Sequence, residues 1–353
     1  MTPMHENHNY LVTAPVTAQG GIASFVNNIT PYLSGDVNIF HRGKSDGKNG
    51  MVSKIMRTLS LPRKFRKAIR EYKPDRILIN SSLSKASMLR DGMLVRAAKR
   101  MGVKTVLFVH GFQHKDANSL KLLRWGYFKA DAIVVLADEF RQILIDAGYK
   151  GPVYVSLNPI DKELFDLTDN NELTGKPGNI MFLSRMVPGK GIKECLQIFE
   201  IVQKKHPELV LNMLGDGECR AEAEKYVADH GMANVVFHGY VTGDAKRTQL
   251  LESLLLLCTS YSEGLPISVL EAMAAGQVVM STAVGGIKDL AALHNFGFMC
   301  QGNSPQEFAE AFEKIYADKA KMDAIRLANK QFAHSHFHPS NIADGIMDCF
   351  DKI

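Results

Sequence analysis

Short apolar runs alternate with segments of helical periodicity along almost the whole chain. The apolar runs are rich in Val, Ile and Leu and lack polar alternation, which predicts strands buried on both faces, as in a parallel sheet. In the first half they are Tyr10–Ala14, Val37–Phe40, Arg76–Asn80, Thr105–Val109, Ala132–Leu136 and Val153–Ser156. Helical spacing of apolar residues is found between them, at Ile22–Leu33, Arg63–Tyr72, Ala86–Met101 and Glu139–Ala147.

A polar segment, Asp161–Pro177, interrupts this alternation and is interpreted as a linker. The alternation then restarts, with predicted strands at Ile180–Ser184, Leu209–Leu214, Val235–His238, Leu254–Cys258 and Val278–Ser281. Two or three helices are expected from Gln306 to Asp351. The pattern therefore predicts two doubly wound α/β domains in series. Ligands are expected at the carboxyl ends of the strands, in a cleft between the domains.

Composition agrees with this fold class and indicates the cell compartment in which the protein is expected. The chain has 353 residues, 46% of them hydrophobic and 22% charged, as expected for two globular domains with real cores. Its five cysteines form no C-x-x-C pair and no zinc-ligand pattern, which indicates free thiols in a reducing compartment. The polar segment Met1–Asn9 has no apolar signal core. We therefore expect a cytoplasmic protein, while association with a membrane surface stays open.

The segment Cys258–Asp289 carries the strongest chemical signal. A predicted strand ends near Cys258, and Glu263-Gly264-Leu265-Pro266 then lead into a helix. Proline suits the first helical position, and glycine lets the backbone approach a ligand closely. The free N–H groups and the dipole of the helix start favour an anion, so a phosphate is expected there.

Glu271 is the second feature of this segment. It falls on the apolar stripe of the predicted helix, with Ile267 and Leu270. A carboxylate on a buried stripe is costly unless it is hydrogen-bonded, and the two hydroxyls of a ribose would supply donors. Glu263, at the start of the helix, is expected to reach the same cavity, so that two carboxylates flank one anion site.

The segment runs from a strand through EGLP, a helix, AAG and a second strand to GG. This order resembles the signature of glycosyltransferase family 4. The resemblance implies a GT-B fold, with two Rossmann-like domains facing across a cleft. It implies that Glu263 contacts the transferred sugar and that Glu271 binds the ribose. It also implies that the Gly264-Leu265-Pro266 stretch meets the sugar and phosphates, in a retaining enzyme that needs no metal and no cofactor.

Two further loops of the second half resemble the same family. Ser184–Gly191 is similar to its S-R-x-x-x-x-K-G loop, in which Arg185 and Lys190 would neutralise the donor diphosphate and the charge that develops as the glycosidic bond breaks. Gly215 belongs to a G-x-G turn that the resemblance places near the base or ribose. Asp289 stands where the family often has Glu, which leaves the choice of donor sugar open.

The first half carries weaker signals. Gly20 and Gly21 follow the first predicted strand and open a helix, and the resemblance places them beside the phosphates and sugar; a simple turn is the alternative. His110 ends the strand Thr105–Val109, where the family often has a histidine close to the reacting sugar. A histidine with a purely structural role is the alternative here. Asn158–Asp161 resembles the family's hinge between the domains.

These features together define an expected organisation. Residues 1–158 are expected to bind the acceptor, with a C-terminal helix, about 337–353, that crosses back to them. Residues 159–336 are expected to bind a nucleotide-sugar, with UDP as the nucleotide that the resemblance favours. The expected activity moves a hexose or N-acetylhexosamine to an acceptor hydroxyl, on a lipid-linked or growing surface glycan, as in polysaccharide biosynthesis.

The stretch Lys54–Lys73 contains eight Lys or Arg and one acid, Glu71. Pro62 is expected to open its helix and Pro74 to close it. Such a basic amphipathic helix predicts docking on the anionic inner face of the cell membrane. A solvated helix face that packs on the sheet is the alternative, and no nucleic-acid motif accompanies the charges.

Other classes of protein remain as competitors to different degrees. No G-x-G-x-x-G follows a predicted first strand, which excludes a nicotinamide-dependent dehydrogenase. A nucleotide-sugar epimerase of the same architecture and a catalytically silent nucleotide-sugar-binding partner stay open, as do the donor, the acceptor, the linkage formed and the oligomeric state.

Overall fold

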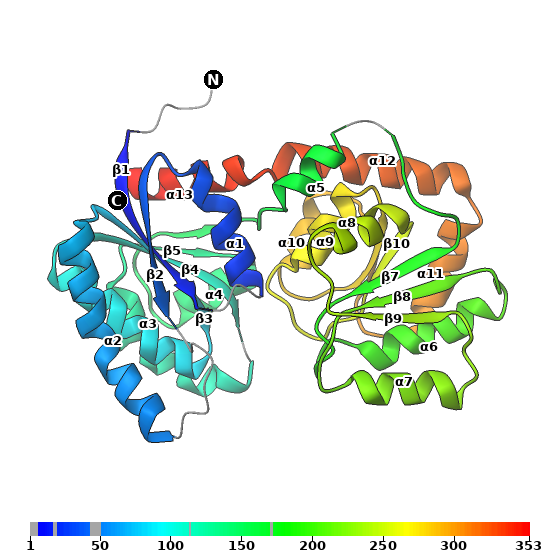
Figure 1. The fold of residues 1–353 in the computed structure, drawn as a ribbon, viewed down its shortest axis with the longest axis horizontal. Helices are drawn as coiled ribbons and strands as arrows, with labels where there is room; N and C mark the ends of the chain where they lie inside the picture. The colour runs from blue at the N-terminus through cyan, green and yellow to red at the C-terminus, as the bar shows by residue number, and fades with distance from the viewer. Residues whose placement is uncertain (1–5, 17–19, 43–50, 113, 170–171) are drawn as a thin grey trace. The chain divides into compact units, whose positions relative to one another are not determined.

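The computed structural model describes residues 6–16, 20–42, 51–112, 114–169 and 172–353. They form two compact units, each an α/β fold around its own sheet (Figure 1). The N-terminal unit runs to Pro159 and takes in the C-terminal segment Pro339–Ile353, and the C-terminal unit covers Ile160–His338. No helix in the described part of the chain is both long and apolar enough to cross a membrane.

The N-terminal unit is built on a six-stranded parallel sheet in the order β2-β1-β3-β4-β5-β6. Its strands are β1 (His8–Pro15), β2 (Gly35–Arg42), β3 (Arg76–Leu83), β4 (Lys104–Phe112), β5 (Ala132–Val135) and β6 (Val153–Val155). Its helices are α1 (Gly21–Ile29), α2 (Met51–Tyr72), α3 (Lys85–Arg100), α4 (Asp138–Asp146) and α13 (Pro339–Asp351), with 3-10 segments at Thr30–Tyr32, His114–Trp125 and Tyr127–Lys129. The chain order reverses between β1 and β3, which is where such a sheet opens a crevice at its carboxyl edge.

Helix α2 shows why this unit folds as it does. Leu61, Phe65 and Ile69 are buried in the core that also contains residues of the sheet and of α3, and α2 and α3 lie together on one face (Figure 1). The prediction that Pro62 opens this helix is wrong, because α2 begins at Met51 and Pro62 lies inside it. A proline inside a helix removes one backbone hydrogen bond. The helix is nevertheless continuous, and Leu61 and Phe65, on either side of the proline, are both buried.

The C-terminal unit repeats the design with the order β12-β11-β10-β7-β8-β9, again parallel. Its strands are β7 (Asn179–Leu183), β8 (Val210–Leu214), β9 (Val235–Gly239), β10 (Leu255–Cys258), β11 (Val278–Thr282) and β12 (Gly297–Cys300). Its helices are α5 (Lys162–Leu167), α6 (Ile192–Gln203), α7 (Arg220–Asp229), α8 (Gly243–Glu252), α9 (Ile267–Ala274), α10 (Gly286–Leu293), α11 (Pro305–Tyr316) and α12 (Lys319–His336). Here the order reverses between β7 and β10.

The fold class expected from the sequence, two doubly wound α/β units, is confirmed. Strand β12 and helix α5 are among the elements that were not predicted. Strand β12 is only four residues long, too short to show an apolar pattern. It begins at Gly297, whose φ is 140° and where a Cβ would lie 2.5 Å from Val279 O, so a glycine stands where a strand residue would be expected. Helix α5 lies inside the stretch taken as a linker, where Asp161 caps it and Leu164 is buried.

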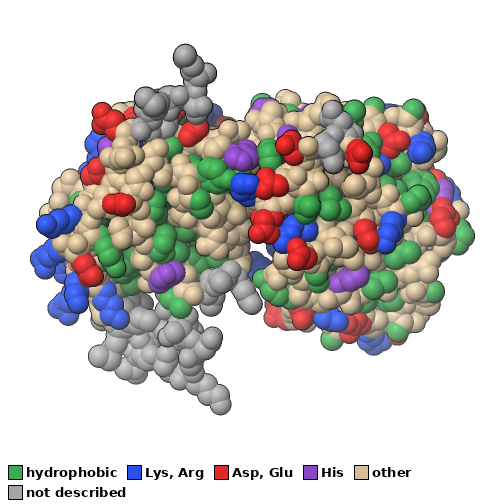
Figure 2. Space-filling view, turned by 45° about the horizontal axis from the view of Figure 1, so that its top comes forward, with side chains coloured by type: hydrophobic (Ala, Val, Ile, Leu, Met, Phe, Trp, Pro, Cys, Tyr) green, Lys and Arg blue, Asp and Glu red, His purple; other side chains and the backbone are tan. Residues whose placement is uncertain are grey.

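The two units carry opposite net charges. The N-terminal unit has 25 Lys and Arg against 14 Asp and Glu, a net charge of +11, whereas the C-terminal unit has 17 against 23, a net charge of −6. Figure 2 shows Lys and Arg side chains gathered at the edge of the N-terminal unit that α2 forms. The mild overall charge of +5 therefore conceals a strongly basic unit.

Candidate active site

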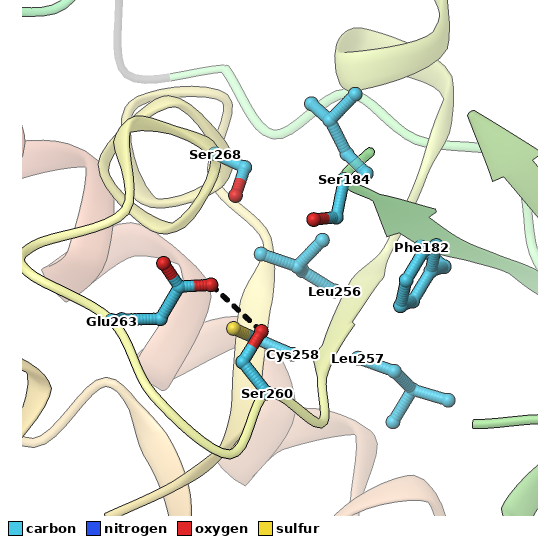
Figure 3. A pocket seen from close by; sticks show the side chains of 9 residues that line it. Phe182, Ser184, Leu256, Leu257, Cys258, Ser260, Glu263 and Ser268 are labelled. Carbon is cyan, nitrogen blue, oxygen red and sulfur yellow. Dashed lines mark hydrogen bonds between the residues drawn. The ribbon is translucent and has the colours of Figure 1, made fainter. Parts of the chain in front are cut away.

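A pocket opens in the C-terminal unit at the carboxyl ends of β7 and β10, where the strand order reverses (Figure 3). The empty space along its lining, part of which is open to solvent, is about 220 Å³. Its lining residues are Phe182, Leu183, Ser184, Leu256, Leu257, Cys258, Ser260, Glu263 and Ser268. Open parallel sheets bind their ligands at such reversal points, so the pocket lies where the fold favours a small polar ligand.

Glu263 and Lys190, predicted from separate loops, are in direct contact at this pocket. Lys190 Nζ lies 2.6 Å from Glu263 Oε1. The hydroxyl of Ser260 donates to the same oxygen at 2.7 Å (Figure 3). The two charged side chains are 17% and 12% exposed. Because both are largely buried, the pair is oriented by the protein rather than by solvent.

The loop from β7 to α6 is fixed by backbone contacts that only glycine allows. Gly191 caps α6 in the left-handed region, and a Cβ there would lie 1.8 Å from Thr259 O. The amide of Tyr261 donates to Gly189 O at 2.9 Å. This loop and the loop after β10 are thereby held together, which brings Lys190 to Glu263.

Arg185 lies on the same loop, directly after Ser184. It is exposed, and its guanidinium has no hydrogen bond or ion pair with any residue in the described part of the chain. A cation without a counter-charge beside a strand-end pocket is suited to binding an anion.

Gly215 lies at the carboxyl end of β8, against this loop. Its φ is 138°, and a Cβ would lie 1.8 Å from Ser184 O. Gly217 has the same role, because a Cβ there would lie 2.4 Å from Met186 O. The G-x-G turn therefore lets two loops approach closely, and its glycines are required by the backbone before any ligand is considered.

Glu271 is buried on α9, as its place on the apolar stripe predicted, and is 3% exposed at its side chain. The partner that the structure provides is Lys246 of α8, whose Nζ lies 2.6 Å from both carboxylate oxygens. Burial raises the pKa of Glu271, and the charge of Lys246 and its hydrogen bond oppose that rise. Sequence reasoning missed Lys246, because no local pattern connects it to a glutamate on another helix.

The EGLP loop before α9 differs from its prediction in one respect. Pro266 is the residue that caps α9, with an extended ψ of 125°, and the helix begins at Ile267. The placement of Pro266 at the first helical position is therefore wrong by one residue, because its backbone still follows the incoming loop. Leu265 as a whole residue is only 3% exposed, so its side chain packs into the core. The carbonyl of Gly264 accepts a hydrogen bond from the Gly286 amide at 2.6 Å, which fixes the loop against the turn after β11.

His110 of β4 belongs to the N-terminal unit and has a defined tautomer. Its ring lies 4.7 Å, between centroids, from both Phe25 and Phe108. Asn80 Nδ2 donates to Thr13 O at 2.9 Å, so Asn80 Oδ1 is the atom that faces His110 Nε2, also at 2.9 Å. Nε2 therefore carries the hydrogen and Nδ1 is an acceptor. Burial lowers the pKa of His110 to about 3, helped by the charge of Arg42, and the ring is neutral at physiological pH.

Gly20 and Gly21 begin α1 in the same unit. Gly20 has a φ of 101°, a conformation that favours glycine, whereas the backbone places no such demand on Gly21. Among the described residues, no atom lies within 4 Å of a Cβ placed at either position. Gln19, quoted with them from the sequence, lies outside the described residues.

Metal ligands do not gather in the part of the chain that the structure describes. No group of three or more His, Cys, Asp or Glu side chains there is placed to hold a metal ion. The five cysteines are all free, and burial raises the pKa of Cys258, beside the pocket, to about 11.

The structure defines the fold class, two parallel α/β units with a pocket at a strand-order reversal, and comparison with known families names the family. A model described as glycosyl transferases group 1 matches residues 166–332, and one described as glycosyltransferase family 4 matches residues 38–164. The chain belongs to the glycosyltransferases of this family 4 type.

Individual relatives agree with that assignment. The chain is 25% identical over 268 residues to the uncharacterized glycosyltransferase YqgM of Bacillus subtilis, covering 72% of this chain and 73% of that protein. It is 26% identical over 242 residues to one component of the human phosphatidylinositol N-acetylglucosaminyltransferase, covering 67% of this chain but only 49% of the human protein.

Solved structures show the fold. Anabaena HepE in complex with UDP and glucose superimposes with a TM-score of 0.74 at 16% identity, covering 98% of this chain and 100% of HepE. Sucrose-phosphate synthase of Thermosynechococcus elongatus gives a TM-score of 0.77 at 14% identity, covering 97% and 98%. The GT-B fold expected from the sequence is therefore confirmed.

Proposed function

We propose that this glycosyltransferase is a retaining, metal-independent enzyme that transfers a hexose or N-acetylhexosamine from a UDP-sugar to an acceptor hydroxyl. The observation that carries the proposal is the set of charged groups at the carboxyl edge of the C-terminal sheet. Arg185, the Lys190–Glu263 pair and the buried Glu271 all lie on the loops or the helix that surround the strand-order reversal.

Each of these groups has a role in binding the donor. Arg185 and Lys190 neutralise the diphosphate, for which no metal ion is then needed. Glu271 accepts hydrogen bonds from the ribose hydroxyls, and Glu263 accepts them from the transferred sugar. HepE was solved with UDP and with UDP-glucose, which supports UDP as the nucleotide.

The reaction follows from these placements. The bond between the anomeric carbon and the diphosphate oxygen breaks, and Arg185 and Lys190 stabilise the negative charge that collects on the leaving group. The acceptor oxygen bonds to the anomeric carbon from the same face, and its proton passes to the leaving diphosphate. Neither Glu263 nor Glu271 acts as a nucleophile. In the N-terminal unit, Nδ1 of neutral His110 is the ring atom that accepts a hydrogen bond from a hydroxyl of the substrate that this unit binds.

The donor assignment is tested by thermal unfolding with UDP, GDP, ADP, CMP and their sugar conjugates. UDP at a hundred times its dissociation constant stabilises the protein by about 2.7 kcal/mol, which we expect to raise the melting temperature by roughly 5–10 °C. Arg185→Ala and Glu271→Ala are expected to lose this rise, and Arg141→Ala, an exposed arginine of the N-terminal unit, is expected to keep it.

A protein that no nucleotide stabilises would contradict the donor assignment. Isomerisation of the bound UDP-sugar without any acceptor would instead identify an epimerase. Binding of UDP without turnover in the presence of membrane acceptors would identify a catalytically silent partner.

We propose that the N-terminal unit takes a lipid-linked or growing surface glycan as acceptor on the cytoplasmic face of the cell membrane. Its charge of +11 is suited to an anionic leaflet. On α2, Arg63, Lys64, Lys67 and Arg70 are exposed, while the apolar face is used in the core. Contact with lipid through α2 is therefore electrostatic, and Lys54 and Arg57 have side chains outside the described residues.

Vesicle flotation tests this surface. The protein is expected to float with vesicles that contain roughly one-third phosphatidylglycerol at low salt and to stay unbound with pure phosphatidylcholine. Each basic residue near an anionic surface contributes about 1 kcal/mol, so the triple variant Lys64→Glu/Lys67→Glu/Arg70→Glu is expected to bind roughly 100-fold more weakly or worse. A matched reversal on the C-terminal unit, Lys204→Glu/Lys205→Glu/Lys225→Glu, is expected to bind like wild type. Equally weak binding to both lipids would refute membrane docking.

A further inference from the structure

The two acids at the candidate donor site each have a lysine partner, but the two lysines differ in origin. Lys190 comes from the loop that carries Arg185, whereas Lys246 comes from α8 and belongs to no motif recognised in the sequence. Its Nζ lies 2.6 Å from both oxygens of Glu271, and its side chain is 27% exposed.

We infer that Lys246 is a positioning residue for the donor, which keeps Glu271 ionised and oriented to receive the ribose hydroxyls. The inference rests on the donor site proposed above. A carboxylate has about four lone-pair sites, so Lys246 leaves acceptor sites on both oxygens for the two hydroxyls. A protonated carboxyl would lose part of that capacity and would present a donor of its own.

The charged groups packed around Glu271 identify Lys246 as the cation that acts on it. Asp161, at the start of α5, disfavours the Glu271 charge, and Arg247 of α8 holds Asp161 at 2.9 Å. On α12, the Nε of Arg326 and the Nζ of Lys330 are bonded to the backbone oxygens of Gly276 and Glu172, at 2.8 and 2.7 Å. Among the described residues, the ion pair that Glu271 makes is the one with Lys246.

Lys246 also offsets the cost of burying the Glu271 carboxylate.

Binding of UDP measured by calorimetry between pH 7 and pH 9 tests the inference. In Lys246→Met, the buried Glu271 loses its cation and its pKa rises further. A larger share of the carboxyl is then protonated at pH 7, so UDP binding is expected to weaken about tenfold at that pH. Raising the pH ionises more of the carboxyl, so the loss of affinity should shrink between pH 7 and pH 9. Lys246→Arg should bind UDP within about threefold of wild type throughout.

Two comparisons separate positioning from other roles. Lys225→Met removes an equally short lysine–carboxylate pair on α7 and is expected to leave UDP binding unchanged at every pH. In a Glu271→Gln background, Lys246→Met should have no further effect, since no carboxyl remains to protonate.

An Lys246→Met loss that is the same at pH 7 and pH 9, or that persists in the Glu271→Gln background, would overturn the inference. If the wild-type protein binds UDP and Lys246→Met binds it equally well, the role of Lys246 is refuted while the donor proposal stands. A wild-type protein that binds no nucleotide would refute the donor proposal, and this inference with it.

Discussion

Replacing Glu263 by glutamine is expected to lower sugar transfer by roughly 100- to 1,000-fold in a protein that stays folded, the size of loss seen when one preorganised electrostatic group is removed. The carboxylate accepts the ammonium of Lys190 and the hydroxyl of Ser260 on one oxygen, which leaves the other for the transferred sugar. Glutamine keeps the shape but removes the charge that orients Lys190. Release of UDP from the UDP-sugar measures cleavage of the donor, with water taking the sugar when no other acceptor is added.

Glu194→Gln supplies the matched control, because this carboxylate bonds the Tyr261 hydroxyl at 2.6 Å on the same side of the sheet. It is expected to keep activity within about threefold of wild type. A Glu263→Gln enzyme that retained a third of the wild-type rate would show that the loop binds the donor through its backbone alone.

The positions of the candidate site residues could be predicted as far as they depend on local sequence. Glu263, Glu271 and Arg185 belong to strand-end loops or helix starts whose spacing fixes their position near the strand ends. The contact between Lys190 and Glu263 depends on Gly191 and Tyr261, which tie together two loops that lie far apart in the sequence. No periodicity reports such a contact, because it is a property of the folded sheet.

Lys246 and Asn80 show the same limit from another side. Lys246 precedes Glu271 by 25 residues and lies on a helix of weak amphipathicity, so nothing in α8 marks it as a partner. Asn80 was predicted only as the end of an apolar strand. Its bond to Thr13 O turns its Oδ1 towards His110 and so fixes the tautomer of that histidine. In both cases the residue acts on a predicted site residue from a neighbouring element, and the chain order hides the relation.

The elements themselves were predicted where packing follows the local pattern. The strands of both sheets lie close to their apolar runs, because each run is buried on both faces. The misses share a cause: Pro62, Gly297 and the polar start of α5 all carry signals for turns, and tertiary packing overrides them. The same packing explains why α2 cannot offer its apolar face to a membrane.

Removing the Asp91 carboxylate is expected to destabilise the N-terminal unit by about 3–5 kcal/mol, the range for breaking a buried ion pair at one partner. Asp91 is fully buried, and Arg42, with a side chain only 4% exposed, lies 2.6 Å from it. Arg90 bonds both of its oxygens at 2.7 and 2.8 Å, and the Ser81 hydroxyl donates to one of them. Asp91→Ala leaves Arg42 buried without its counter-charge. Urea unfolding followed by the fluorescence of Trp125, the single tryptophan, reports on this unit.

The dependence of stability on pH provides a second test of the predicted role of Asp91. Burial acts to raise the pKa of Asp91, but Arg42, Arg90 and Ser81 outweigh it and hold that pKa below its usual range. The stabilisation is therefore complete above the unfolded pKa of about 3.9 and is lost as the pH falls below it. The difference in free energy of unfolding between wild type and Asp91→Ala should be largest at pH 7 and should decrease towards pH 3. Asp146→Ala, at an exposed carboxylate that accepts from Gln142, should cost less than about 0.5 kcal/mol at either pH. A difference in free energy of unfolding that is the same at pH 7 and pH 3 would mean that Asp91 contributes by packing rather than by charge.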